Sequence, residues 1–181
     1  GGRLGKKDHS ALKQVEQQGC TRKKNDNNFY LDPSEKVRHF SLEKARAVAR
    51  KHPESYIIGS DTLVEKNGEV MGKPKSEDDA RHMLSRHSGD SVNVLTGHAL
   101  LKGEKEESLI IKSKVYFKKL SDIEIDNYIK SQEPMDKAGA FAIQGLGATL
   151  IERIDGDFYS VMGLSIYATS QLLKKFDINI L

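Results

Sequence analysis

Three short segments of this chain carry side chains suited to metal, phosphate or proton chemistry, and the first is Gly59-Ser60-Asp61-Thr62. Asp61 follows the apolar run Tyr56-Ile57-Ile58, which is typical of a buried strand. We therefore expect its carboxylate at the end of a sheet, where α/β proteins bind ligands. A carboxylate in that place can hold Mg²⁺, which prefers oxygen ligands, or take a proton from water. The alternative is an Asp-Thr turn that only caps the strand.

The second segment is Gly72-Lys73-Pro74, which follows an expected hairpin around Asn67-Gly68. Lys73 stands between a flexible residue and a rigid one, and a cation fixed in this way can neutralise a phosphate. The alternative is a solvated lysine in a turn.

The third segment joins Asp136-Lys137-Ala138-Gly139-Ala140 to Ile143-Gln144-Gly145. Its small residues would let backbone amides approach a ligand closely. The adjacent acid and base, Asp136 and Lys137, suit a metal–phosphate site. Gln144 offers a paired donor and acceptor to a nucleotide base. The alternative is a glycine-rich loop with a structural role only.

One mechanism would use all three segments. In it, a divalent cation bridges the phosphates of a nucleotide, lysines balance their charge, and a carboxylate activates the attacking water. The sequence contains no Gly-x-x-x-x-Gly-Lys-Ser/Thr, Gly-x-Gly-x-x-Gly, His-Glu-x-x-His or Gly-x-Ser-x-Gly motif. The phosphate-loop, dinucleotide, zinc-protease and serine-hydrolase sites that depend on those motifs are therefore excluded.

Composition limits the class of protein further. The 181 residues carry a formal net charge of +3, and residues 1–28 hold seven Lys and Arg against three Asp and Glu. The excess basicity is confined to that segment and does not require a nucleic-acid partner. A single cysteine, Cys20, excludes an internal disulfide and suits a reducing compartment. No apolar run approaches the roughly 18 residues of a membrane helix and no secretory signal is visible, so we expect a soluble, cytoplasmic protein.

The elements that must position these side chains can be predicted from hydrophobic spacing, caps and turns. We expect helices that start near Ser34, Ser76 and Ser121, with Ser34 as the cap of the first, and a closing helix over 163–176. We expect strands over 56–59, 91–101, 109–117 and 150–154, and a hairpin over 63–71. This order predicts an α/β or α+β domain with a mixed sheet rather than a doubly wound one.

In the same order, these segments resemble the Maf family of nucleoside triphosphate pyrophosphatases. The matching blocks are short and together cover about residues 33–178. They are Gly59-Ser60-Asp61-Thr62, Gly72-Lys73-Pro74, Met83-Leu84-Ser85-Arg86-His87-Ser88-Gly89, Glu133-Pro134-Met135-Asp136-Lys137-Ala138-Gly139-Ala140-Phe141, Ile143-Gln144-Gly145 and Ile154-Asp155-Gly156-Asp157-Phe158-Tyr159-Ser160-Val161-Met162-Gly163-Leu164.

The resemblance implies an elongated, two-lobed α/β fold around a mixed sheet, with the site in the cleft. It implies a house-cleaning hydrolase that uses Mg²⁺ or Mn²⁺, forms a homodimer and converts dTTP or UTP to the monophosphate and pyrophosphate. Asp61 would hold the metal and accept the proton of the water that attacks the α-phosphorus. Lys44 and Lys73 would bind phosphates, and Thr62 and Gln144 would read the base. The substrate-binding residues that it implies are Lys44, Thr62, Lys73, Asp136, Lys137 and Gln144.

The sequence departs from the family at residues 1–28, so we divide it into this basic segment and a Maf-like domain over 29–181. Family members begin with a strand that leads into a Ser-x-Ser-Pro-Arg-Arg loop, which is absent here. Either the phosphate grip is lost and activity falls, which we favour, or Lys6, Lys7 or the Arg22-Lys23-Lys24 cluster partly replaces it. The alternative function is accordingly a catalytically weakened nucleotide-binding or regulatory protein.

Overall fold

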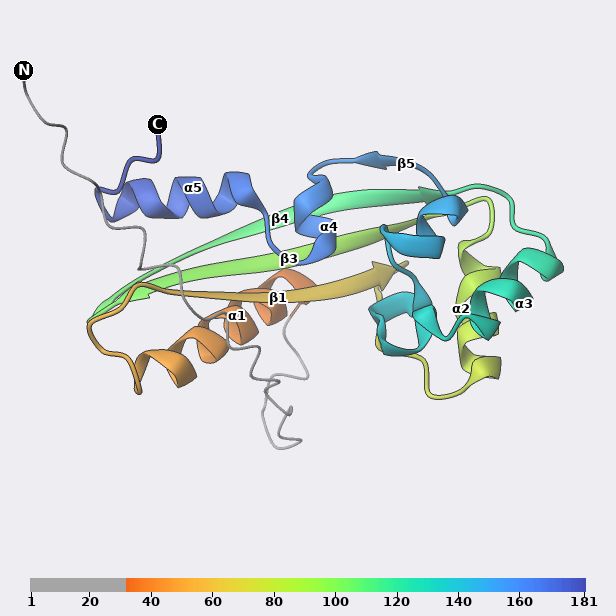
Figure 1. The fold of residues 1–181 in the computed structure, drawn as a ribbon, viewed down its shortest axis with the longest axis horizontal. Coiled ribbons are helices and arrows are strands. Elements are labelled where there is room, and N and C mark those ends of the chain that lie inside the picture. Colours follow the sequence, from red (N-terminus) through yellow and green to blue (C-terminus); the bar gives the residue numbers. More distant parts are fainter. Residues whose placement is uncertain (1–31) are drawn as a thin grey trace, which may run out of the picture.

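Residues 32–181 are the part of the chain that this computed structural model describes, so the predicted basic segment 1–28 lies outside it. The described residues form one five-stranded sheet in the order β2-β1-β3-β4-β5, with helices packed around it (Figure 1). The strands are β1 (Ile57–Lys66), β2 (Glu69–Met71), β3 (Ser91–Lys102), β4 (Lys105–Phe117) and β5 (Ile151–Asp155). The α-helices are α1 (Pro33–Ala49), α2 (Glu77–His87), α3 (Asp122–Lys130), α4 (Phe158–Met162) and α5 (Ile166–Lys175).

The predicted α/β class is confirmed, and the molecule is elongated along its strands (Figure 1). Each pairing within residues 32–181 is antiparallel, so this part of the chain by itself contains no parallel pair of a mixed sheet. Within the same residues, no helix has the length and apolar character needed to cross a membrane.

Helices cover both faces of the long strands. On β3, Ala99 and Leu101 pack with Ala45 of α1, whereas Leu100 between them packs with Leu172 of α5. Successive strand residues point to opposite faces, so α1 and α5 lie on opposite sides of the sheet, as Figure 1 shows. The largest buried cluster lies at the other end of the molecule, where α2 and α3 pack beside the sheet (Figure 1).

Helix α1 lies unusually close to the sheet because two strand positions are glycine. A Cβ atom added to Gly97 of β3 would lie 2.2 Å from the carbonyl oxygen of Val37, and one added to Gly59 of β1 would lie 2.3 Å from that of Ser41. Val37, Ser41 and Ala45 are spaced four residues apart and form the buried stripe of the helix. Only glycine permits this approach, so these two positions set where α1 sits.

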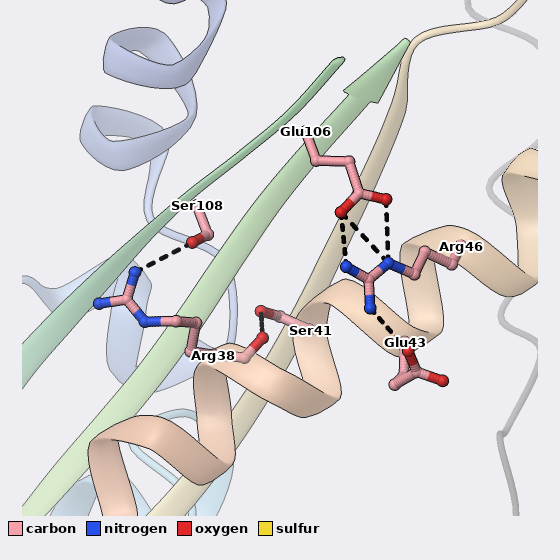
Figure 2. Close-up of polar contacts among 6 residues, drawn as sticks. All are labelled: Arg38, Ser41, Glu43, Arg46, Glu106 and Ser108. Atoms are coloured by element: carbon pink, nitrogen blue, oxygen red, sulfur yellow. Dashed lines mark hydrogen bonds and ion pairs between the residues drawn. The ribbon is translucent and has the colours of Figure 1, made fainter. Parts of the chain in front are cut away.

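Polar contacts fix α1 along the sheet (Figure 2). Arg46 donates to the Glu106 carboxylate of β4 through Nε (2.9 Å to Oε1) and Nη2 (2.6 Å to Oε2). Arg38, two turns earlier on the helix, donates from Nη1 to Ser108 Oγ at 3.2 Å. The two arginines hold one side of α1 against β4, which leaves Lys44 to reach the β1 side.

Most of the predicted caps and turns are confirmed. Asn67 and Gly68 have φ of 53° and 83° and turn β1 into β2, as their sequence predicts. Ser76 caps α2 by accepting from the Asp79 amide, and Ser121 forms a capping box with Glu124 at the start of α3.

The predicted cap of the first helix was wrong. Asp32 accepts from the amides of Ser34 and Glu35, and Pro33 occupies the first turn, where its missing N–H costs nothing. The closing helix α5 also begins at Ile166, later than expected, and the separate helix α4 precedes it.

Candidate active site

Asp61 lies in the middle of β1, not after a strand end as we predicted. β1 continues to Lys66 because β3 pairs with it along nearly its whole length, and Asp61 is opposite Gly97. The pairing partner is remote in sequence, so no local pattern marks it. The carboxylate therefore lies on a face of the sheet rather than at its end, directly under α1.

Among residues 32–181, hydrogen bonds reach one of the two carboxylate oxygens of Asp61. Lys44 of α1 donates from Nζ to Asp61 Oδ1 at 2.7 Å and to the Ser60 carbonyl oxygen at 3.1 Å. Asp61 is only 7% exposed, and its Oδ2 has no hydrogen-bond partner among residues 32–181. A buried oxygen without a partner costs about 1–3 kcal/mol, and such an atom points to a ligand, an ion or a reacting water.

Thr62, the next residue of β1, faces the other side of the sheet and lines a pocket of about 300 Å³. The pocket walls are largely apolar, which suits the flat face of an aromatic base. The apolar lining residues are Val64, Val94, Ala138, Phe141, Ala142, Ile143, Val161 and Met162. The polar lining residues are Thr62, Asp136, Lys137 and Gln144. Four of the residues predicted for the site therefore meet in one pocket.

Two of the predicted cations, Lys137 and Lys73, lie near Asp136 of the pocket lining. Lys137 forms a close ion pair with Asp136. This hydrogen bond, together with the charge of Lys73, lowers the pKa of Asp136 below its ordinary value. Lys73 is exposed, two residues after Met71, which pairs with Val64 of β1. It therefore leaves the sheet beside the Asp61-Thr62 segment.

The loop that carries Asp136 and Lys137 is fastened at Gly139. Its N–H donates to the Gly72 carbonyl at 2.9 Å, which ties this loop to the Lys73 turn. His87 of α2 lies 2.8 Å through Nε2 from the Gly139 carbonyl, which can only accept, so Nε2 carries the proton. Burial holds the pKa of His87 down at about 4, so the ring is neutral at pH 7.

Sequence reasoning missed how the Gln144 loop is held. Glu133 Oε1 accepts from the Gly147 N–H at 2.9 Å, and Glu133 Oε2 accepts from the Leu146 N–H at 3.0 Å. The Tyr128 hydroxyl donates to Glu133 at 3.1 Å and accepts from the Ala142 N–H at 3.2 Å. Burial opposes ionisation of Glu133, but these hydrogen bonds keep its pKa below the ordinary value. The available sequence signal was that Glu133 opens one of the blocks that resemble the Maf family.

Six of the seven predicted residues fall on the two faces of β1, and the seventh, Lys73, lies just after β2. Asp61 and Lys44 lie on the α1 side, and the base-sized pocket with Thr62 and Gln144 lies on the other side. Over residues 57–63, β1 has no second strand partner within the described part of the chain, because β2 pairs only with residues 64–66. Within the described residues, the pocket and the Asp61 carboxylate thus lie on either side of a strand edge that has no partner strand.

The Asp61 carboxylate suits a cation that a bound ligand also coordinates. Within residues 32–181, no three His, Cys, Asp or Glu side chains come together as a metal site. Asp61 Oδ2 is a hard oxygen donor with no partner in the described part of the chain, and Mg²⁺ is commonly bound by one or two carboxylates together with substrate phosphates. Asp61 therefore fits a Mg²⁺ or Mn²⁺ ion that a phosphate ligand also coordinates.

Comparison with known proteins shows the family of this chain. A family model described as "Maf-like protein" matches residues 9–176. A dTTP/UTP pyrophosphatase of Bacillus velezensis is 44% identical over 151 residues, which span 83% of this chain and 80% of that protein. A dTTP/UTP pyrophosphatase of Symbiobacterium thermophilum is 46% identical over 144 residues, 80% of this chain and 74% of that protein. The chain therefore belongs to the Maf-like protein family.

Proposed function

We propose that this chain is a hydrolase that converts a nucleoside triphosphate of the dTTP or UTP type to the monophosphate and pyrophosphate. The observation that carries this proposal is the buried Asp61 beside Lys44, across β1 from a base-sized pocket. One of the Asp61 carboxylate oxygens has no hydrogen-bond partner in the part of the chain that the structure describes. The names of the relatives, dTTP/UTP pyrophosphatases, support the substrate class.

In this proposal the base enters the pocket beside Thr62 and Gln144, and the phosphates cross the edge of β1 that has no partner strand within residues 32–181. Three lysines would carry positive charge toward the phosphates. Lys73 and Lys137 lie on the pocket side of β1, and Lys44 lies on the opposite face beside Asp61. Fixed cations stabilise the charge that moves onto the leaving group in phosphoryl chemistry.

Asp61 accepts a proton from the water that attacks the α-phosphorus. A P–O bond forms from the water, and the bond from the α-phosphorus to the bridging oxygen breaks, so pyrophosphate leaves. Lys44 keeps Asp61 Oδ1 engaged, so Oδ2 is the oxygen left for the proton or for a cation. A Mg²⁺ or Mn²⁺ ion held by Asp61 and the phosphates would neutralise phosphate charge when bound.

Pyrophosphate release from dTTP, UTP, CTP, ATP and GTP with Mg²⁺ or Mn²⁺ tests the proposal. Release from dTTP or UTP above the other nucleotides supports it, and the Asp61→Asn variant is expected to lose that release. If pyrophosphate is released from none of these nucleotides, the proposed enzymatic activity is rejected.

The second candidate is a nucleotide-binding or regulatory protein with little turnover, and the absence of a Ser-Pro-Arg-Arg loop from the sequence favours it. Calorimetric titration with UTP beside the same assay distinguishes the two. Binding without pyrophosphate release supports the second candidate. The homodimer, the cytoplasmic location and the lack of a nucleic-acid partner stay predictions.

A further inference from the structure

We propose that Thr96 fixes the Thr62 hydroxyl as a hydrogen-bond acceptor toward the pocket, so that the pocket selects a base with a ring N–H. Thr96 is a positioning residue in this proposal, because it acts on the ligand only through Thr62. The inference rests on the proposed function for its substrate class, and it adds a residue and a chemical rule for base choice.

A count of hydroxyl protons gives the direction of each bond. Thr96 Oγ1 lies 2.8 Å from the carbonyl oxygen of Ser160, and a carbonyl can only accept, so Thr96 donates its single hydroxyl proton there. Thr62 Oγ1 lies 3.0 Å from Thr96 Oγ1. Since the proton of Thr96 is already committed, Thr62 is the donor in that pair. The Thr62 oxygen then has only lone pairs to offer to a ligand.

The Ser160 carbonyl oxygen, which accepts the Thr96 proton, is held in place by contacts around α4. Thr96 is fully buried opposite Thr62 in the β1–β3 pairing. The Ser160 carbonyl also accepts from the Gly163 N–H at 2.9 Å, and the Ser160 hydroxyl is engaged with Ser113 Oγ at 3.0 Å. Reversal of the Thr62–Thr96 bond would leave the Thr96 hydroxyl oxygen and the Ser160 carbonyl oxygen 2.8 Å apart in a buried place with no proton between them, which is costly.

Thr62 is half-buried and lines the pocket. In the proposal, the lone pairs of Oγ1 that are not used by Thr96 are directed toward the space that a base would occupy. Uracil and thymine carry a ring N3–H between two carbonyl groups, whereas the N3 atom of cytosine is an acceptor without a proton. An acceptor on the protein attracts the first pattern and repels the second. Buried hydrogen-bond complementarity of this kind discriminates strongly between otherwise similar ligands.

The test compares Thr96→Val, which keeps the shape and removes the hydroxyl, with Thr96→Ser, which keeps the hydroxyl. For the full chain, kcat/KM for UTP and CTP is measured by pyrophosphate release, and binding of both is measured by calorimetry. In Thr96→Val the Thr62 hydroxyl no longer donates to Thr96, so it can donate its proton toward the pocket. The ratio of kcat/KM for UTP to kcat/KM for CTP should therefore fall by about tenfold or more. Thr96→Ser should keep the ratio of the unmodified chain.

An N3-methylated nucleotide and a double variant test the role of Thr96 in two further ways. UTP methylated at N3 should bind the unmodified chain at least about tenfold more weakly than UTP. In a Thr62→Val background, Thr96→Val should change the UTP/CTP binding ratio no further. If Thr96→Val does not fold, as its melting temperature would reveal, the binding of UTP and N3-methyl-UTP to the unmodified chain decides.

The inference and the proposed function fail in different ways. A folded Thr96→Val variant with an unchanged UTP/CTP ratio, or equal binding of UTP and N3-methyl-UTP, overturns the role of Thr96. Selective UTP binding without turnover leaves that role in place and rejects only the catalysis. If neither UTP nor CTP binds, the role of Thr96 and the proposed function are both rejected.

Discussion

Asp61 and Thr62 are consecutive residues of β1, yet Asp61 contacts Lys44 of α1 on one face of the sheet and Thr62 contacts Thr96 and the pocket on the other. The alternation of strand side chains requires this divergence. A change at Asp61 should therefore affect chemistry, and a change at Thr62 should affect base choice.

Replacement of Asp61 by Asn should separate these roles. Asn keeps an oxygen for Lys44 but cannot accept the proton of a water at the second position, so kcat for UTP should fall by about 10²- to 10⁴-fold. UTP binding, measured by calorimetry, should change little. Thr62→Val should mainly alter the UTP/CTP ratio. An Asp61→Asn variant with unaltered kcat would contradict the assignment of the proton acceptor.

Replacement of Lys44 by Met should remove the cation that faces Asp61 Oδ1 at 2.7 Å. With a buried carboxylate left unpaired and a phosphate partner lost, kcat/KM for UTP should fall at least about tenfold. Lys51→Met, at an exposed lysine just beyond α1, is the matched control and should retain activity. Equal activity of the two variants would count against a role for Lys44.

Replacement of Gly97 by Ala should destabilise the fold, because the new Cβ would lie 2.2 Å from the Val37 carbonyl oxygen and force α1 away from the sheet. We expect the free energy of unfolding in urea to fall by about 1–3 kcal/mol. Gly72→Ala, where a Cβ meets nothing within 4 Å, is the control for stability and should be close to neutral. A stable Gly97→Ala variant would mean that α1 can shift freely.

Acid should weaken the fold through His87. Burial lowers its pKa to about 4, so between the ordinary pKa of 6.5 and pH 4 the unfolded chain binds a proton that the folded chain does not. Stability is therefore lost as the pH falls through that window, by up to roughly 3 kcal/mol. Denaturant unfolding at pH 7 and pH 4.5 measures the loss. His87→Gln should reduce the loss, and His82→Gln, at an exposed histidine, should leave it as it was.

Replacement of Glu133 by Gln should loosen the loop that carries Gln144. The carboxylate accepts from two backbone N–H groups and from Tyr128, whereas an amide nitrogen cannot accept, so at least one of these bonds is lost. KM for UTP should rise about tenfold, with a smaller effect on kcat. Glu152→Gln, at an exposed glutamate of β5, should match the unmodified chain. No change in KM for Glu133→Gln would show that the loop keeps its place without the carboxylate.

The sequence by itself determined the features that depend on near neighbours. The Asn67-Gly68 turn and the Ser76 and Ser121 caps involve residues no more than four positions apart, so their chemistry is visible in a short window. The same locality explains why the segments that carry Lys73 and Gln144 could be picked out. Even there, the Asp32 cap was missed because Ser34, two residues later, is an equally acceptable cap by type.

Only the tertiary structure decided which of these residues meet. Pairing with β3 extends β1 through Asp61, and Thr62 meets Thr96, 34 residues further along the chain. Gly59 and Gly97 let α1 come close enough for Lys44 to reach the carboxylate. Sheet register and helix docking are set by packing between segments distant in sequence, so composition and spacing could suggest the chemical groups but could not place them on the two faces of one strand.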